Sequence, residues 1–128
     1  MPALRQKILI AEDDHDLRRM FRMALAFAGF EVREAADGLD ALRVIDYDPP
    51  DLVVLDLMLP SIGGLLVQQE IAANALTRQI PIVIVTGSDL PFDEGIAKCV
   101  LRKPVMPERL VQAVRECLHS GGPGAGTR

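Results

Sequence analysis

The feature that most constrains the fold is an alternation of short apolar runs with segments of helical periodicity. Four runs rich in Ile, Leu and Val cover residues 7–11, 52–57, 80–85 and 100–101, and an alternating segment covers 30–35. The segments that follow carry apolar residues three or four positions apart, and glycine or proline often ends them. Strands that alternate with helices in this way predict an α/β fold, in which helices cover both faces of a parallel sheet.

Length and charge narrow the class of protein. The chain has 128 residues, 49% of them hydrophobic, which suits one compact domain. We place this domain at residues 6–119 and predict that the Gly-rich end, residues 120–128, is disordered. A net charge of −4, with scattered basic residues, argues against nucleic-acid binding. No apolar run is long enough to cross a membrane and no secretory signal pattern opens the sequence, so we expect a cytoplasmic protein.

Polar residues stand at the ends of four predicted strands. Glu12 and Asp13 follow the first strand, Asp56 lies in the third, Thr86 closes the fourth and Lys103 follows the fifth. Taken alone, any of these acids could be a helix cap or a turn former. Asp56 is harder to explain in this way, because it interrupts an apolar run in which an unpaired charge is costly. Because parallel strands end at one edge of a sheet, we expect these side chains to meet.

Such a group of residues favours phosphoryl chemistry. Three carboxylates repel one another unless a cation joins them, and oxygen ligands suit a hard ion such as Mg²⁺. Lys103 can balance negative charge, and the Thr86 hydroxyl can donate a hydrogen bond to an incoming oxygen. These are the groups that an in-line phosphoryl transfer to an aspartate needs.

The motifs together resemble the receiver domains of bacterial response regulators, the phosphorylated partners in two-component signalling. The resemblance covers residues 8–118 and rests on four motifs in order, which are Ile8-Leu9-Ile10-Ala11-Glu12-Asp13-Asp14, Leu55-Asp56-Leu57-Met58-Leu59-Pro60 with Gly64, Thr86-Gly87 and Lys103-Pro104. It implies a doubly wound, flavodoxin-like sheet of five strands in the order 2-1-3-4-5. It also implies that a sensor histidine kinase or a histidine phosphotransfer protein gives a phosphoryl group to the domain, which later hydrolyses it and switches its binding to a downstream protein target.

The resemblance assigns a role to each acidic residue. Asp56 would be the phosphoacceptor and, with Asp13, a direct ligand of Mg²⁺. The backbone carbonyl of Met58 would be a further ligand, and Glu12 would act on the metal through water. The domain would then catalyse only its own phosphorylation and dephosphorylation, and would not be an enzyme that turns over outside molecules.

The resemblance also assigns the remaining strand-end residues and a partner surface. Thr86 and Lys103 would contact the phosphoryl oxygens, and the Lys103–Pro104 peptide bond would be cis. Apolar residues beside the acidic pocket could dock the phosphodonor, or could simply pack a helix against the core. The candidates for this docking surface are Leu17, Met20, Pro104 and Val105.

The sequence departs from the usual pattern between the fourth and fifth strands. This segment is shorter than in most receivers, and Pro91 and Gly95 interrupt it, so we expect the fourth helix to be short or absent. Val100 stands where receivers usually carry a switch aromatic residue. The chain therefore resembles a subgroup of receivers with a shortened fourth helix. We expect activation to change the order of residues 87–98 and not to rotate an aromatic ring.

Two other functions remain open. A pseudo-receiver would keep the fold and act only as a docking module, although the complete set of polar strand-end residues argues against this alternative. A Mg²⁺-dependent phosphohydrolase also uses an aspartyl nucleophile, but such enzymes usually carry a second Asp two positions later, where this chain has Met58. No output domain is visible, so the chain is either a stand-alone receiver or a piece of a larger protein.

Overall fold

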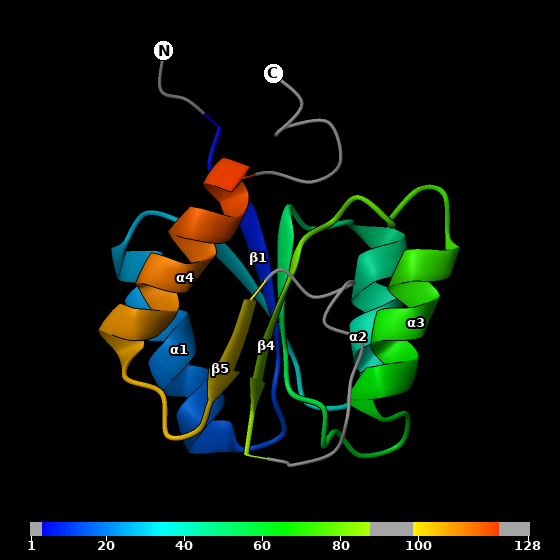
Figure 1. Cartoon of the computed structure of the whole chain (residues 1–128), viewed down its shortest axis with the longest axis horizontal. Helices are drawn as coiled ribbons and strands as arrows, with labels where there is room; N and C mark the ends of the chain where they lie inside the picture. Colours follow the sequence, from blue (N-terminus) through cyan, green and yellow to red (C-terminus); the bar gives the residue numbers. More distant parts are fainter. Residues whose placement is uncertain (1–3, 88–98, 121–128) are drawn as a thin grey trace.

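The computed structural model describes residues 4–87 and 99–120, which contain five strands and four helices (Figure 1). In chain order the elements are β1 (Lys7–Ala11), α1 (His15–Phe27), β2 (Glu31–Ala35), α2 (Gly38–Tyr47), β3 (Leu52–Leu55), α3 (Gly64–Ala73), β4 (Ile82–Thr86), β5 (Cys99–Arg102) and α4 (Pro107–Ser120). None of the helices in these two ranges is long and apolar enough to cross a membrane.

The strands form one parallel sheet in the order β2-β1-β3-β4-β5, which confirms the predicted α/β class and strand order. Helices α1 and α4 cover one face of the sheet, and α2 and α3 cover the other (Figure 1). The order of the strands reverses between β1 and β3, because β2 lies on one side of β1 and β3 lies on its other side. A site at this reversal point lies at the carboxyl ends of β1 and β3.

The sheet separates two apolar cores. Successive residues of a strand point to opposite faces, so Ile8 and Ile10 pack with α1 and α4, whereas Leu9 and Ala11 pack on the side of α2 and α3. All four of these side chains are fully buried. Strands that are buried on both faces read as continuous apolar runs, which explains the sequence pattern.

A side-chain cap and a glycine turn define the two ends of α1. The Asp14 carboxylate caps this helix by accepting a hydrogen bond from the Leu17 N–H at 3.0 Å. Beyond the other end of this helix, Gly29 adopts a positive φ of 103°, a conformation that glycine tolerates best. The flanking residues Asp14 and Gly29 therefore fix where the first helix begins and ends.

Several boundaries differ from the predictions. Strand β3 ends at Leu55, not at residue 57, because the Asp56 side chain accepts a hydrogen bond from the Met58 N–H and turns the chain. Helix α4 includes Ser120, one residue into the predicted tail. The short or absent helix expected before β5 falls at residues 88–98 and the rest of the tail at 121–128, and both segments lie outside the described residues.

Candidate functional site

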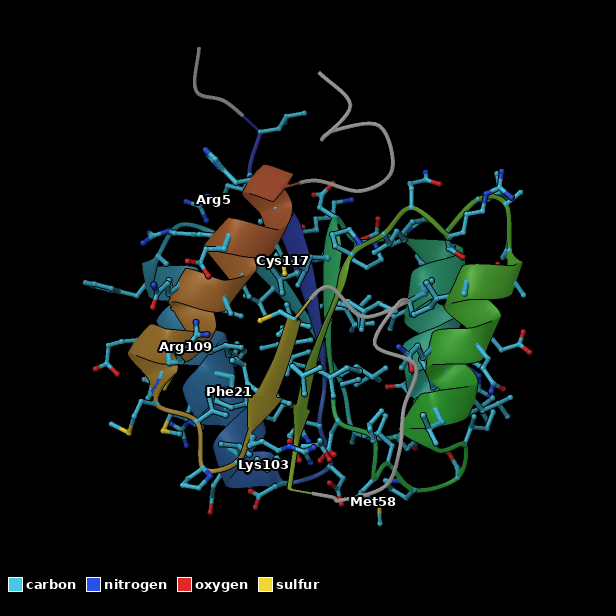
Figure 2. The ribbon with its side chains drawn as sticks, viewed as in Figure 1. Arg5, Phe21, Met58, Lys103, Arg109 and Cys117 are labelled. Carbon is cyan, nitrogen blue, oxygen red and sulfur yellow. The ribbon has the colours of Figure 1, made fainter. Side chains whose placement is uncertain are left out.

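The predicted strand-end residues meet at one edge of the sheet. Glu12 and Asp13 follow β1, Asp56 follows β3, and Lys103 follows β5. Figure 2 shows Lys103 and Met58 at this same end of the molecule, where the strands of the sheet terminate. A shallow cleft opens there, and it is lined by Glu12, Asp13, Asp14, Asp56, Met58, Gly87 and Lys103. The parallel arrangement of the strands has therefore brought together residues that lie far apart in the sequence.

Asp56 is buried and held in place by two donors. Its side chain is 4% exposed. One carboxylate oxygen, Oδ1, accepts a hydrogen bond from the Met58 N–H at 2.9 Å, and Oδ2 accepts one from Lys103 Nζ at 2.8 Å. Its own N–H donates to the Ala11 carbonyl on β1. Asp56 therefore presents a fixed carboxylate at the floor of the cleft.

Lys103 balances the charge of two buried acids. Its Nζ lies 2.8 Å from Asp56 Oδ2 and 2.8 Å from Glu12 Oε1. Burial alone would lower the pKa of the lysine, but the hydrogen bonds to Asp56 and Glu12 outweigh it and raise the pKa. Lys103 is therefore a permanent cation in this cleft.

Glu12 carries an unusual pKa for a glutamate. Burial raises the pKa of Glu12 to about 6, in opposition to Lys103 and to the Asp14 N–H, both of which favour the charged form. The nearby Asp56 carboxylate adds to the rise. Glu12 therefore takes up a proton more easily than an ordinary glutamate does.

The three acids form a group that fits a hard cation. Glu12, Asp13 and Asp56 each bring one carboxylate oxygen to a cluster in which these atoms lie within 4.8 Å of one another. Asp13 is exposed, so solvent can reach the cluster. Carboxylates with room for water are the ligands that Mg²⁺ prefers, whereas Zn²⁺ favours His and Cys. The donor set therefore fits magnesium.

Thr86 ends β4 beside the cleft and is fully buried. Its backbone carbonyl accepts a hydrogen bond from the Lys103 N–H at 3.0 Å. This bond joins the end of β4 to the lysine loop, in which the Lys103–Pro104 peptide bond is cis, as predicted. Gly87, the next residue, lines the cleft.

The residues predicted to dock a partner differ in their exposure. Met20 is 41% exposed, Pro104 is exposed and Leu17 is half-buried against the core. Val105 is only 7% exposed and packs between the sheet and helices α1 and α4. Of the four predicted docking residues, Val105 therefore offers a partner the least side-chain surface, because its side chain contributes to the core.

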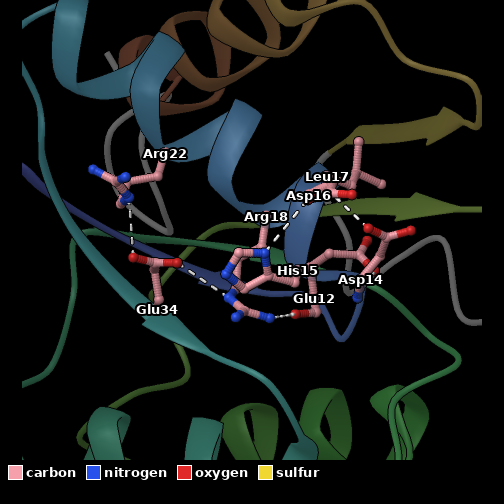
Figure 3. A network of polar contacts seen from close by, with 8 residues as sticks. All are labelled: Glu12, Asp14, His15, Asp16, Leu17, Arg18, Arg22 and Glu34. Carbon is pink, nitrogen blue, oxygen red and sulfur yellow. Dashed lines mark hydrogen bonds and ion pairs between the residues drawn. The ribbon is translucent and has the colours of Figure 1, made fainter.

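Sequence reasoning did not single out Arg18, which lies behind the acidic loop. Its Nη1 donates a hydrogen bond to the Glu12 carbonyl at 2.8 Å, and its Nε donates to Glu34 Oε1 at 3.1 Å (Figure 3). The sequence gives only a weak indication of these contacts, namely an arginine one turn into a helix that follows an acidic loop.

Comparison with known proteins identifies the family. A family model described as the response regulator receiver domain matches residues 8–115. The chain belongs to this family. The receiver is 35% identical over 122 residues to the phosphate regulon transcriptional regulatory protein PhoB of Pseudomonas aeruginosa, with 91% of this chain and 53% of that protein covered. It is also 36% identical over 124 residues to the DNA-binding response regulator MtrA of Mycobacterium tuberculosis, which covers 93% of this chain and 53% of MtrA.

Solved structures agree with the receiver fold. The chemotaxis response regulator CheY4 of Vibrio cholerae superposes with a TM-score of 0.82 at 26% identity, over 88% of this receiver and 98% of CheY4. A CheY-like receiver domain protein from Methanospirillum hungatei gives a TM-score of 0.80 at 26% identity, with 88% and 93% of the two chains covered. The chain spans about half the length of the curated relatives it matches.

Proposed function

We propose that this receiver accepts a phosphoryl group on Asp56 and that phosphorylation switches its binding to a downstream protein. The donor would be a phosphohistidine on a sensor histidine kinase or a histidine phosphotransfer protein. We place the receiver domain at residues 6–119 and its action in the cytoplasm. The observation that carries the proposal is the position of Asp56, which lies at the floor of an acidic cleft, 4% exposed, with Lys103 Nζ 2.8 Å away.

The chemistry is a single displacement at phosphorus. A carboxylate oxygen of Asp56 forms a new bond to phosphorus while the bond from phosphorus to the donor imidazole breaks, and the bonding electrons leave with the imidazole nitrogen. Lys103 lies close enough to Asp56 to stabilise the negative charge of the incoming phosphoryl oxygens. The Met58 N–H keeps Asp56 oriented before the transfer. Hydrolysis of the resulting acyl phosphate would return the receiver to its starting state.

A divalent cation completes the site in this proposal. Glu12, Asp13 and Asp56 would hold Mg²⁺, with Glu12 acting through water and the Met58 backbone carbonyl as a further ligand. When bound, the ion supplies positive charge that stabilises the oxygens of the transferring group. The raised pKa of Glu12 supports this role, because a neighbouring cation favours the carboxylate form that burial disfavours.

The surface beside the cleft supports a docking role. Leu17 lies in the first turn of α1, Met20 follows one turn later, and Pro104 follows the lysine. Partly exposed apolar residues next to a reactive site suit the approach of a donor helix. We expect Leu17→Ala and Met20→Ala to slow phosphotransfer from a protein donor but to leave phosphorylation by acetyl phosphate unchanged. Equal rates with the protein donor would contradict this part of the proposal.

Intact-mass measurement after incubation with acetyl phosphate tests the acceptor. With Mg²⁺, the wild type should gain the mass of one phosphoryl group, and with EDTA it should gain none. Asp56→Asn keeps the size and the hydrogen-bonding oxygen of the side chain, but its amide is not a nucleophile, so it should gain none in either condition.

Asp46→Asn is the matched control, because Asp46 is an exposed acid on α2 and its loss should leave phosphorylation intact. If the Asp56→Asn protein became phosphorylated, the acceptor would have to be another residue. A wild type that gains no phosphoryl group, either from acetyl phosphate or from phosphorylated histidine proteins, would favour the docking-module alternative.

A further inference from the structure

Glu12 is held from four directions. Its N–H donates to the Ala35 carbonyl on β2 at 3.0 Å, and its carbonyl accepts from Arg18 Nη1 at 2.8 Å. Its Oε2 accepts from the Asp14 N–H at 3.1 Å, and its Oε1 lies 2.8 Å from Lys103 Nζ. Three of these contacts come from groups that border the cleft or from the adjacent strand. The fourth comes from Arg18, which lies behind the acidic loop and does not line the cleft.

Arg18 connects the acidic loop to the edge strand of the sheet. One end of its guanidinium binds the Glu12 carbonyl, and the other end binds the carboxylate of Glu34 on β2 at 3.1 Å (Figure 3). The Arg18 side chain is only 15% exposed, so water competes little for these bonds. A planar guanidinium can make both contacts at once, because its donors point in fixed and different directions.

Arg22 provides an internal comparison, since it lies one turn further along α1. Its Nε pairs with the other carboxylate oxygen of Glu34 at 3.1 Å, but its side chain is 40% exposed. Among the contacts of the described residues, Arg22 binds Glu34 and does not reach the acidic loop (Figure 3). Two arginines of equal charge thus share one anchor, and only Arg18 extends the connection to Glu12.

We propose that Arg18 is a positioning residue for the cation site: anchored by Glu34, it fixes the backbone of Glu12 and thereby the places of the Glu12 and Asp13 carboxylates. This inference rests on the proposed function, in which these carboxylates hold Mg²⁺. The loop needs such support because its acids and Asp56 repel one another in the metal-free protein. The positive Arg18 binds the loop through a backbone carbonyl and leaves every carboxylate of the cluster available to the cation.

The sign of the effect on Mg²⁺ binding separates positioning from simple electrostatics. If Arg18 acted only through its charge, then Arg18→Met would remove repulsion and strengthen Mg²⁺ binding. Positioning predicts the opposite result. Loss of a group that orients metal ligands typically weakens metal binding by about 10-fold to 100-fold, and we expect about 10-fold here. Arg22→Met removes the same charge from the same helix and should change the dissociation constant less than about twofold.

The experiment is Mg²⁺ titration by calorimetry of the wild type, Arg18→Met and Arg22→Met, with backbone amide exchange measured in EDTA. The amides of Asp13 and Asp14 should exchange faster in Arg18→Met than in the other two proteins, because the loop has lost its bond at Glu12. In the Arg18→Met background, Glu34→Gln should weaken Mg²⁺ binding no further, since the anchor then has no link to the loop.

Mg²⁺ binding by Arg18→Met that equals or exceeds wild-type binding would overturn the inference, and so would equal weakening in Arg22→Met. A wild type that binds no Mg²⁺ would instead count against the proposed function. In that case amide exchange still decides the role of Arg18, because it is measured without metal, and unchanged exchange at Asp13 and Asp14 would refute positioning.

Discussion

Replacing Lys103 with methionine removes the cation that two buried acids share. Lys103→Met keeps most of the length of the side chain but leaves Glu12 and Asp56, which are 2% and 4% exposed, without their common partner. We expect the metal-free variant to be destabilised by about 3 kcal/mol near neutral pH, because each acid then remains buried without its counter-ion.

The magnitude follows from the geometry. At 2.8 Å and an effective dielectric constant of about 20, each ion pair corresponds to about 6 kcal/mol of Coulomb energy. Desolvation of the lysine offsets much of this energy, and removal of one partner from a buried pair usually costs about 3–5 kcal/mol. The low end applies because Glu12, with a pKa of about 6, can take up a proton in the variant and so reduce the repulsion. A domain of this size typically has about 5–15 kcal/mol of stability, so the variant should still fold.

The assay is urea unfolding in EDTA, followed by circular dichroism because the chain has no Trp. The free energies of unfolding are compared at about pH 7.5 and at about pH 5. At the lower pH Glu12 is protonated in both proteins, so the difference between wild type and Lys103→Met should shrink. Mg²⁺ should stabilise the variant more than the wild type, because in the wild type the lysine already pairs with the same acids.

Lys7→Met is the matched control. Lys7 pairs with Asp48 at 2.7 Å, but both side chains are about one-third exposed, so its loss should have little effect. The reasoning is refuted if Lys103→Met unfolds within about 1 kcal/mol of the wild type at neutral pH, since that is the range of an exposed pair. A difference that stays constant with pH would also contradict it.

Two further predictions concern the local structure of the site, and both are tested by urea unfolding in EDTA. The pKa of Glu12 is about 6 in the folded protein, above the ordinary glutamate value of 4.5, so the folded state binds this proton more tightly than the unfolded state does. The free energy of unfolding should therefore fall by about 2 kcal/mol as pH rises through this interval, and Glu12→Gln should abolish the fall. A pH profile that Glu12→Gln leaves unchanged would argue against the raised pKa. Gly64→Ala should cost about 1–3 kcal/mol, because a Cβ there would overlap the Asp56 carbonyl oxygen and lie 2.5 Å from Leu57 Cα. Gly63→Ala, whose nearest such contact is 3.9 Å away, should be nearly neutral, and equal losses in the two variants would contradict the steric explanation.

The gathering of the acidic residues and Lys103 could be predicted from sequence because it depends only on topology. Parallel strands end at one edge of their sheet, so a polar residue that follows a strand must lie at that edge whatever the details of side-chain packing. Asp56 was the clearest case, because a charge inside an apolar run has few structural explanations.

The contacts behind the site could not be predicted in this way. The bonds from Arg18 to Glu34 and to the Glu12 carbonyl depend on the rotation of α1 about its axis and on its distance from β2. A pattern of apolar spacing gives the helix face only approximately, and an arginine in such a pattern reads as a solvated residue. The burial of Val105 could not be predicted for a related reason, because it is decided by packing against α1 and α4 and not by the neighbours of Val105 in the sequence.

The two cores on opposite faces of the sheet have a consequence for protein engineering. Substitutions that share no contacts usually have additive effects on stability, within about 0.5 kcal/mol. Substitutions in the core under α1 and α4, for example around Phe21, should therefore have effects on the free energy of unfolding that add to those of substitutions in the core under α2 and α3, for example around Ile71. Variant libraries for the two layers could be screened separately and then recombined, with the shared strands left unchanged.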